Sequence, residues 1–178
     1  MIRLFTALEL PVTVRNRLEE LQGGVPGARW IEPEDMHITL RFIGEVDEDV
    51  AHDIDSSLTA IRAAPFEISL AGIGEFGGKT PRMLWAGVAK SEPLNTLVQK
   101  IENACQRLGL EPETRKYTPH VTLARLRDPP RSKVLDFISH RNLFTTERFA
   151  MKEFVLFSSH PSPHGNQYIA ERRYAFRS

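Results

Sequence analysis

Cysteine is almost absent from this sequence of 178 residues, which contains only Cys105. A single cysteine cannot form an intrachain disulfide, and it cannot supply the several thiolates of a cysteine-rich zinc site. Unpaired thiols are typical of proteins in reducing compartments. Because Cys105 shares the apolar side of a predicted helix with Ile101 and Leu108, we expect it in the core rather than in the role of a nucleophile.

Long hydrophobic runs are also missing. No stretch approaches the roughly 20 apolar residues that a membrane-spanning helix needs. The segment Met1–Pro11 is partly apolar, but Glu9 interrupts it and no small-residue cleavage site follows, so it makes a poor secretory leader. We therefore expect a cytoplasmic protein that does not act at a membrane.

Neither sign of charge is in excess, since 23 Lys and Arg residues balance 23 Asp and Glu residues. This balance argues against a protein that coats long nucleic acids, whose affinity comes from many phosphate contacts. It leaves room for one or two phosphates in a local site. The hydrophobic content of 41% and the charged content of 26% are ordinary for a folded domain.

Periodicity predicts an α+β fold with four helices. Apolar stripes and capping residues place them between Pro11 and Gly23, from Asp47 to before Pro65, from Ser91 to Gly109, and more briefly over 132–138. Runs of β-branched and aromatic residues predict strands, and two pairs of them, joined by polar loops, indicate antiparallel sheets. The predicted strands are 3–10, 36–43, 66–73, 82–89, 121–126, 151–158 and 167–176.

A four-residue motif occurs twice. The string His37-Ile38-Thr39-Leu40 recurs 83 residues later as His120-Val121-Thr122-Leu123. The surrounding pattern recurs too, because a helix-starting proline precedes the first histidine by 26 residues and the second by 27. We interpret 1–178 as one bilobal domain of two pseudo-symmetric repeats, roughly 11–90 and 91–178, with helices outside and a central cleft.

Each motif presents a histidine and a threonine together. Residues i and i+2 of a strand point to the same face, so His37 projects with Thr39, and His120 with Thr122. Two imidazoles can divide an acid–base reaction, since both forms of histidine are populated near neutral pH. Threonine hydroxyls can donate hydrogen bonds to an anionic group. Attack by water or a hydroxyl on a phosphodiester fits this set of groups best.

Two other interpretations of the motif are open. A lone histidine in a strand is usually a surface or structural residue. The duplication of the motif argues against this interpretation for both His37 and His120. Two neutral histidines also bind zinc, but zinc sites use three or four ligands, and no third histidine or acidic residue recurs with the motif. The motif therefore favours acid–base chemistry over a metal site.

The flanking residues resemble the two-histidine (2H) phosphoesterase superfamily, and its RNA 2′,3′-cyclic phosphodiesterase branch, formerly called 2′-5′ RNA ligases, most closely. The resemblance rests on Arg3–Pro11, on His37–Gly44 and on Thr118–Arg125, and it spans nearly the whole chain. It implies a bilobal α+β fold without metal or cofactor. It also implies hydrolysis of a terminal 2′,3′-cyclic phosphate on RNA to a 2′-phosphate.

The resemblance implies a role for each site residue. His37 is expected to be the general acid that protonates the departing 3′ oxygen, and His120 the general base that activates water. Thr39 and Thr122 are expected to hold the nonbridging phosphate oxygens. An aromatic residue five positions after the first histidine stacks on the terminal base in this family, and an arginine five positions after the second binds phosphate. Here these are Phe42 and Arg125.

Strand parity conflicts with these last two roles, because position +5 faces away from the histidine in a regular strand. A bulge or a strand end would be needed to turn Phe42 and Arg125 toward the site. Otherwise one of the two residues has a structural role, and the aromatic Phe42 suits such a role better than Arg125 does. Arg41, at position +4, has the parity to face the cleft and is a reserve candidate.

Other functions remain open. The same site could form 2′-5′ linkages in RNA, although the concentration of water favours hydrolysis. The substrate could instead be a small cyclic nucleotide or an ADP-ribose cyclic phosphate. A noncatalytic module that binds RNA ends or nucleotides would not need two titrating histidines. The expected partner is an RNA 3′ end or a nucleotide carrying a cyclic phosphate, and the expected state is a monomer.

Overall fold

The computed structural model describes residues 1–178 and contains four α-helices and a short 3-10 helix, η1 (Pro33–Asp35). All four α-helices lie where the sequence predicts them: α1 (Val12–Glu20), α2 (Glu48–Thr59), α3 (Glu92–Arg107) and α4 (Arg131–Arg141). Two of the predicted caps are also present. The Asp47 carboxylate accepts a hydrogen bond from the Val50 amide at 2.9 Å, and the Ser91 hydroxyl accepts one from Leu94 at 3.2 Å. These caps satisfy amides that a helix leaves unpaired at its start.

The strands form one large antiparallel sheet and one small one. The large sheet has the order β10-β9-β1-β3-β7-β6-β5, with β2 paired to β7, and the small sheet pairs β4 with β8. The strands are β1 (Ile2–Glu9), β2 (Ala28–Trp30), β3 (His37–Val46), β4 (Phe66–Ile68), β5 (Leu70–Phe76), β6 (Met83–Val88), β7 (His120–Leu126), β8 (Phe149–Met151), β9 (Glu153–Ser162) and β10 (Gly165–Ala175). The fold is therefore α+β, as predicted.

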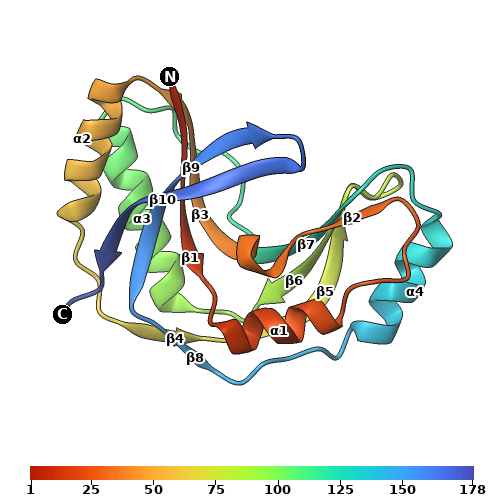
Figure 1. The fold of residues 1–178 in the computed structure, drawn as a ribbon. Coiled ribbons are helices and arrows are strands. Elements are labelled where there is room, and N and C mark those ends of the chain that lie inside the picture. Colours follow the sequence, from red (N-terminus) through yellow and green to blue (C-terminus); the bar gives the residue numbers. More distant parts are fainter.

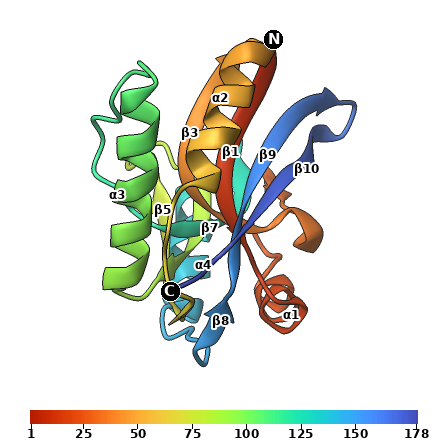
Figure 2. The same cartoon turned by 90° about the vertical axis from the view of Figure 1, so that its left-hand side faces the viewer.

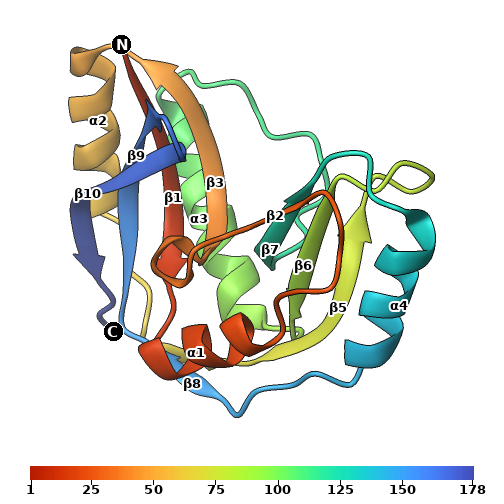
Figure 3. The same cartoon turned by 45° about the vertical axis from the view of Figure 1, so that its right-hand side comes forward.

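The large sheet divides into two lobes where β3 meets β7. These two strands share a single pair of opposed residues, Ile38 and Val121, and then diverge. Figure 3 shows β1, β3, β9 and β10 turned away from β5, β6 and β7. Helices α2 and α3 lie beside the first lobe, and α1 and α4 beside the second (Figure 1). In Figure 2 the β9–β10 hairpin projects on the side of the first lobe away from α3.

The order of elements repeats along the chain. The series β1-α1-β3-α2-β4-β5 is followed by β6-α3-β7-α4-β8-β9, with β2, η1 and β10 as additions. In this order the second series begins at β6, one strand before the division predicted near residue 90. Each lobe takes a strand from the other series, because β9 pairs with β1 and β5 pairs with β6.

Three details differ from the predicted strands. The predicted strand 66–73 is two strands, since β4 pairs with β8 while β5 pairs with β6. The predicted strand 151–158 likewise divides at Lys152 into β8 and a longer β9. The third difference is β2, which has only three residues and is not among the predicted strands. Alternation of apolar and polar residues cannot be recognised over so short a segment.

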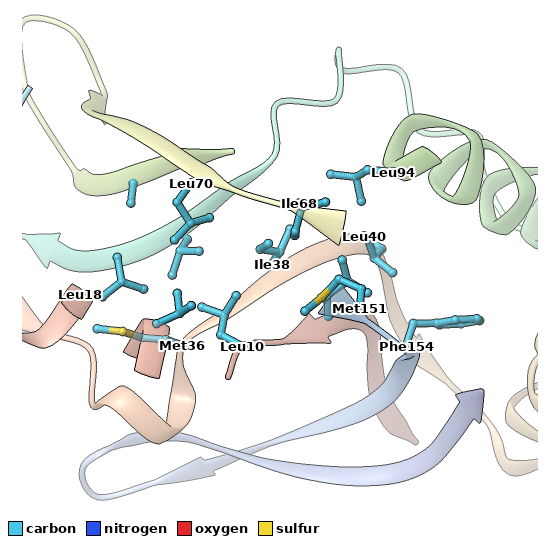
Figure 4. Close-up of a cluster of buried hydrophobic side chains, with 14 of the residues drawn as sticks. Leu10, Leu18, Met36, Ile38, Leu40, Ile68, Leu70, Leu94, Met151 and Phe154 are labelled. Atoms are coloured by element: carbon cyan, nitrogen blue, oxygen red, sulfur yellow. The ribbon is translucent and has the colours of Figure 1, made fainter. Parts of the chain in front are cut away.

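One continuous core joins the two lobes. A cluster of 33 buried residues extends from Leu4 to Phe176. It includes the aliphatic residues of both histidine motifs, and Figure 4 shows Ile38 and Leu40 among Leu10, Leu70 and Met151. Cys105 is also buried in this cluster, as predicted. None of the helices has both the length and the apolar character needed to cross a membrane.

Candidate active site

The two histidine motifs meet at the middle of the large sheet. Ile38 and Val121 are directly opposed and completely buried, so their neighbours point to the other face. In this antiparallel register His37 lies opposite Thr122, and Thr39 opposite His120. Opposed side chains have Cβ atoms about 5 Å apart, and diagonal ones about 7–8 Å. We call this half-buried surface of β3 and β7 the histidine face.

Both imidazoles are oriented in the same way. Nδ1 of His37 lies 2.7 Å from the Asp35 carbonyl oxygen, and Nδ1 of His120 lies 2.7 Å from the Thr118 carbonyl oxygen. A carbonyl only accepts, so Nδ1 is the donor in both rings and Nε2 is left free. These two carbonyls could not be identified from the sequence, because a backbone acceptor two residues before a histidine has no side-chain signal.

Aromatic rings surround the two histidines. The ring of His37 packs near Phe5 of β1 and Tyr168 of β10, with centroids 5.1 and 5.4 Å away. The ring of His120 lies 5.0 Å from Phe76 of β5 and 6.4 Å from Trp85 of β6. This packing restricts how the imidazoles can turn. None of these aromatic residues was identified from the sequence, because they come from strands that only the tertiary fold brings together.

The charge state of His37 is set by its surroundings. Burial is the largest effect and lowers its pKa from the ordinary value of 6.5, because a charged imidazole loses hydration there. The positive charges of His120 and Arg125 lower the pKa further, whereas the Asp35 carbonyl opposes this by accepting a hydrogen bond. His37 in the free protein is therefore mainly neutral at neutral pH, and Arg125 is close enough to influence it.

The threonines differ in their partners. The Thr122 hydroxyl lies 3.5 Å from the sulfur of Met83, a weak acceptor, and the Thr39 hydroxyl makes no hydrogen bond within the protein. Both hydroxyls are thus available to a ligand on the histidine face. Tyr117 donates a hydrogen bond of 2.8 Å to the Thr39 carbonyl, which ties the segment before His120 to β3.

A β-bulge in each motif strand resolves the parity conflict. On β1, Thr6 opposes Arg41 and the next residue, Ala7, opposes Thr39, so Leu40 has no partner. The consecutive residues Leu40 and Arg41 are both buried, and Phe42 then returns to the exposed side with 46% of its surface accessible. Alternation is therefore reset within β3, and Phe42 shares the face of His37.

The same irregularity occurs in β7. Leu84 of β6 opposes Ala124, whereas the next residue, Trp85, opposes Thr122, which leaves Leu123 without a partner. Leu123 and Ala124 are both completely buried, and Arg125 is exposed. The two bulges thus turn Phe42 and Arg125 onto the histidine face.

The expectation for Arg41 was wrong. Because Leu40 bulges, the Arg41 side chain points into the protein, where it is only 7% exposed and pairs with Glu102 at 2.7 Å. Its guanidinium also donates to the carbonyls of Glu111, at 2.6 Å, and Phe42, at 3.2 Å. The Thr6 hydroxyl accepts from the Arg41 amide and donates to the Arg41 carbonyl. Arg41 and Thr6 therefore hold the bulge in place instead of facing a ligand.

Possible metal ligands are not clustered on the histidine face or elsewhere. No group of three or more His, Cys, Asp and Glu side chains is arranged to hold a metal ion.

Comparison with known proteins assigns the family. The model of the 2′-5′ RNA ligase superfamily matches residues 10–162, which include both histidine motifs and both bulges. The chain belongs to the 2′-5′ RNA ligase superfamily. This agrees with the resemblance found in the sequence.

Several superfamily members share one name, RNA 2′,3′-cyclic phosphodiesterase. One from Archaeoglobus fulgidus is 30% identical over 172 residues, which cover 94% of this chain and 96% of that protein. One from Thermotoga maritima is 31% identical over 176 residues, which cover 94% and 91%. A third, from Geobacillus stearothermophilus, is 35% identical over 128 residues, which cover 68% of this chain but only 41% of that longer protein.

Solved structures show the same superfamily fold. TT0787 of Thermus thermophilus superposes with a TM-score of 0.83 at 26% identity and covers 98% of each chain. LigT of E. coli in its apo form has a TM-score of 0.82 at 23% identity and covers 99% of this chain and 98% of its own. The two-lobed arrangement around β3 and β7 is therefore shared with known members.

Proposed function

We propose that this chain hydrolyses the 2′,3′-cyclic phosphate at the 3′ end of RNA to a 2′-phosphomonoester, without a metal. The observation that carries the proposal is the pair of free Nε2 atoms on one face, each imidazole opposed by a threonine. The shared name of the relatives supports this choice of reaction. We further propose that the protein is a cytoplasmic monomer.

Two proton transfers complete the reaction. Neutral His120 accepts a proton at Nε2 from a water molecule as its oxygen bonds to phosphorus. Protonated His37 donates the proton on Nε2 to the 3′ oxygen as the bond from phosphorus to that oxygen breaks. The order of the two roles follows the family resemblance, because the two halves are otherwise alike. Each transfer accelerates such reactions by about 10²–10⁴-fold.

Three further side chains hold the phosphate in this scheme. The hydroxyls of Thr39 and Thr122 donate hydrogen bonds to the nonbridging oxygens, where negative charge increases in the transition state. Arg125 adds a positive charge beside them. These donors are fixed on strands, so they need no rearrangement when the charge develops.

The exposed ring of Phe42 supplies a surface for the terminal base. The Phe5 ring favours this role, since it is buried and nearly parallel to the Phe42 ring, with centroids 6.1 Å apart. Aromatic rings bind bases of any sequence by stacking. Phe42 would therefore orient the terminal nucleotide without selecting strongly among bases.

Phosphorus NMR tests the proposed reaction. With a cyclic-phosphate-ended oligonucleotide in ¹⁸O-labelled water, we expect the cyclic signal to be replaced by a 2′-monoester carrying one ¹⁸O atom. The rate should be unchanged after treatment with a chelator. Formation of a 3′-monoester, or loss of activity that zinc restores, would contradict the mechanism. Addition of a 5′-hydroxyl oligonucleotide tests ligation, which would give a new diester signal.

A second prediction concerns the protonation of His37. In the free protein its imidazole should titrate below 6.5, and inorganic phosphate should raise its pKa, because an anion between the rings stabilises the charged form. Folding stability should therefore fall as the pH decreases below about 6.5, since the unfolded chain binds this proton more readily. Nitrogen NMR over a pH series, with chloride at equal ionic strength as the control, measures both effects. A pKa above 6.5 without phosphate would contradict the prediction.

A further inference from the structure

A second arginine lies beside Arg125. The short strand β2 pairs with β7 so that Arg29 is directly opposite Arg125. Directly opposed residues of antiparallel strands point to the same face, so Arg29 extends the histidine face by one strand. The flanking pair, Trp30 and Ala124, points the other way, toward the core cluster.

This pair of like charges has no acidic partner. Four other arginines form ion pairs with carboxylates, but neither Arg29 nor Arg125 does so. The only hydrogen bond of the Arg29 side chain goes to the His164 carbonyl, at 3.2 Å. Like charges placed directly opposite each other destabilise a sheet. Phosphates bound beside the two arginines would offset this cost.

The contact with His164 holds Arg29 in place. His164 lies at the tip of the β9–β10 hairpin, which belongs to the other lobe. The fit is so close that a Cβ atom added at the next residue, Gly165, would overlap the Arg29 guanidinium. Arg29 is thus oriented before any ligand binds, which reduces the entropy lost on binding.

The direction of the RNA chain across the histidine face also leads to Arg29 and Arg125. Phe42 and Arg125 each follow a histidine by five residues on antiparallel strands, so they lie toward opposite ends of the histidine face. In a ribose the base is attached at C1′ and the 5′ carbon at C4′. These two carbons lie on opposite sides of the ring oxygen. A base on Phe42, with the cyclic phosphate between the histidines, directs the 5′ chain toward Arg125 and Arg29.

We propose that Arg29 binds the phosphodiester on the 5′ side of the terminal nucleotide, so that the preferred substrate is an oligonucleotide and not a cyclic mononucleotide. This inference rests on the proposed function. It extends the site by one phosphate, with Arg125 serving the terminal phosphate and Arg29 the next.

The test compares two substrates in one variant. Arg29→Gln should reduce kcat/KM about tenfold for UpU ending in a 2′,3′-cyclic phosphate, as expected for one charge-assisted contact. It should leave uridine 2′,3′-cyclic phosphate unaffected. Arg107→Gln, which removes the same charge from the end of α3, should change neither rate. An equal loss on both substrates, or no loss on either, would overturn the proposal.

A neutral linkage identifies the contacted phosphate. A methylphosphonate in place of the internal phosphodiester should slow the wild-type protein about tenfold and should not slow Arg29→Gln further. The salt dependence of kcat/KM on UpU cyclic phosphate should be shallower in the variant by about 0.7 in log–log slope. If the methylphosphonate and Arg29→Gln reduced kcat/KM additively, Arg29 would not be the residue that contacts the internal phosphate.

Failure of the proposed function can be distinguished from failure of the Arg29 proposal. In that case the wild-type protein would turn over neither substrate. Binding of UpU with a terminal 2′-phosphate, measured by calorimetry in the same variants, would still decide whether Arg29 holds the internal phosphate. Equal affinities of wild type and Arg29→Gln would then reject the proposal.

Discussion

His37→Ala and His120→Ala should each reduce the rate of 2′,3′-cyclic phosphate hydrolysis by at least about 10²-fold, because each imidazole transfers a proton in the proposed reaction. Both side chains are only half-buried, so the fold should persist in each variant. His140→Ala is the matched control, because His140 is exposed on α4 and bonds only to the Asp136 carbonyl of its own helix. Single-turnover rates together with thermal unfolding separate catalysis from stability. Full activity in either motif variant would exclude the two-histidine mechanism.

A sulfur substitution tests which histidine is the acid. When sulfur replaces the 3′ oxygen of the cyclic phosphate, the leaving group departs without a proton. His37→Ala should then recover most of its activity, whereas His120→Ala should remain inactive because water still needs a base. The opposite pattern would exchange the two roles and leave the rest of the mechanism intact.

The second large effect is expected from Arg41→Met, which removes one partner of a buried ion pair. The Arg41 and Glu102 side chains are 6% and 12% exposed, so an unpaired Glu102 would keep its charge with little hydration. We expect a loss of about 3 kcal/mol in the free energy of unfolding. Arg115→Met should lose less than about 1 kcal/mol, since Arg115 pairs with Glu113 at the surface and is 85% exposed.

The same variant tests whether Arg41 positions the base-stacking ring. Arg41 bonds to the Phe42 carbonyl, so its loss should release the bulge and raise KM more than it lowers kcat, as Phe42→Ala should. Arg41→Lys keeps the charge but cannot donate in the same fork, so it should restore stability only in part. Urea unfolding and steady-state kinetics measure the two effects. An unchanged KM in Arg41→Met would show that Phe42 holds its position without this support.

The sequence predicts the elements of this fold better than it predicts their irregularities. Asp47 and Ser91 cap helices where expected, because a cap depends on residues three positions apart. The faces of His37 and His120 also follow from local alternation. Arg41 could not be placed in this way, because its direction depends on a bulge that Thr6, 35 residues away, stabilises.

Parts of the site depend entirely on tertiary pairing. Arg29 becomes a neighbour of Arg125 only through a strand of three residues, too short to show a period. The carbonyls that fix the two imidazoles, at Asp35 and Thr118, have no signal in the sequence beyond their position. Sequence patterns therefore indicate which groups can react, and the fold decides which groups surround them.

The pairing of β1 with β9 has a consequence for the synthesis of this chain. Leu4 is opposed to Ser158, so during synthesis β1 lacks this partner until more than 150 further residues have been made. Until then one edge of β1 has exposed amides and carbonyls, which other chains can pair with. Contacts this distant in sequence also slow folding. The first lobe therefore depends on the synthesis of β9 before this edge of β1 is protected from aggregation.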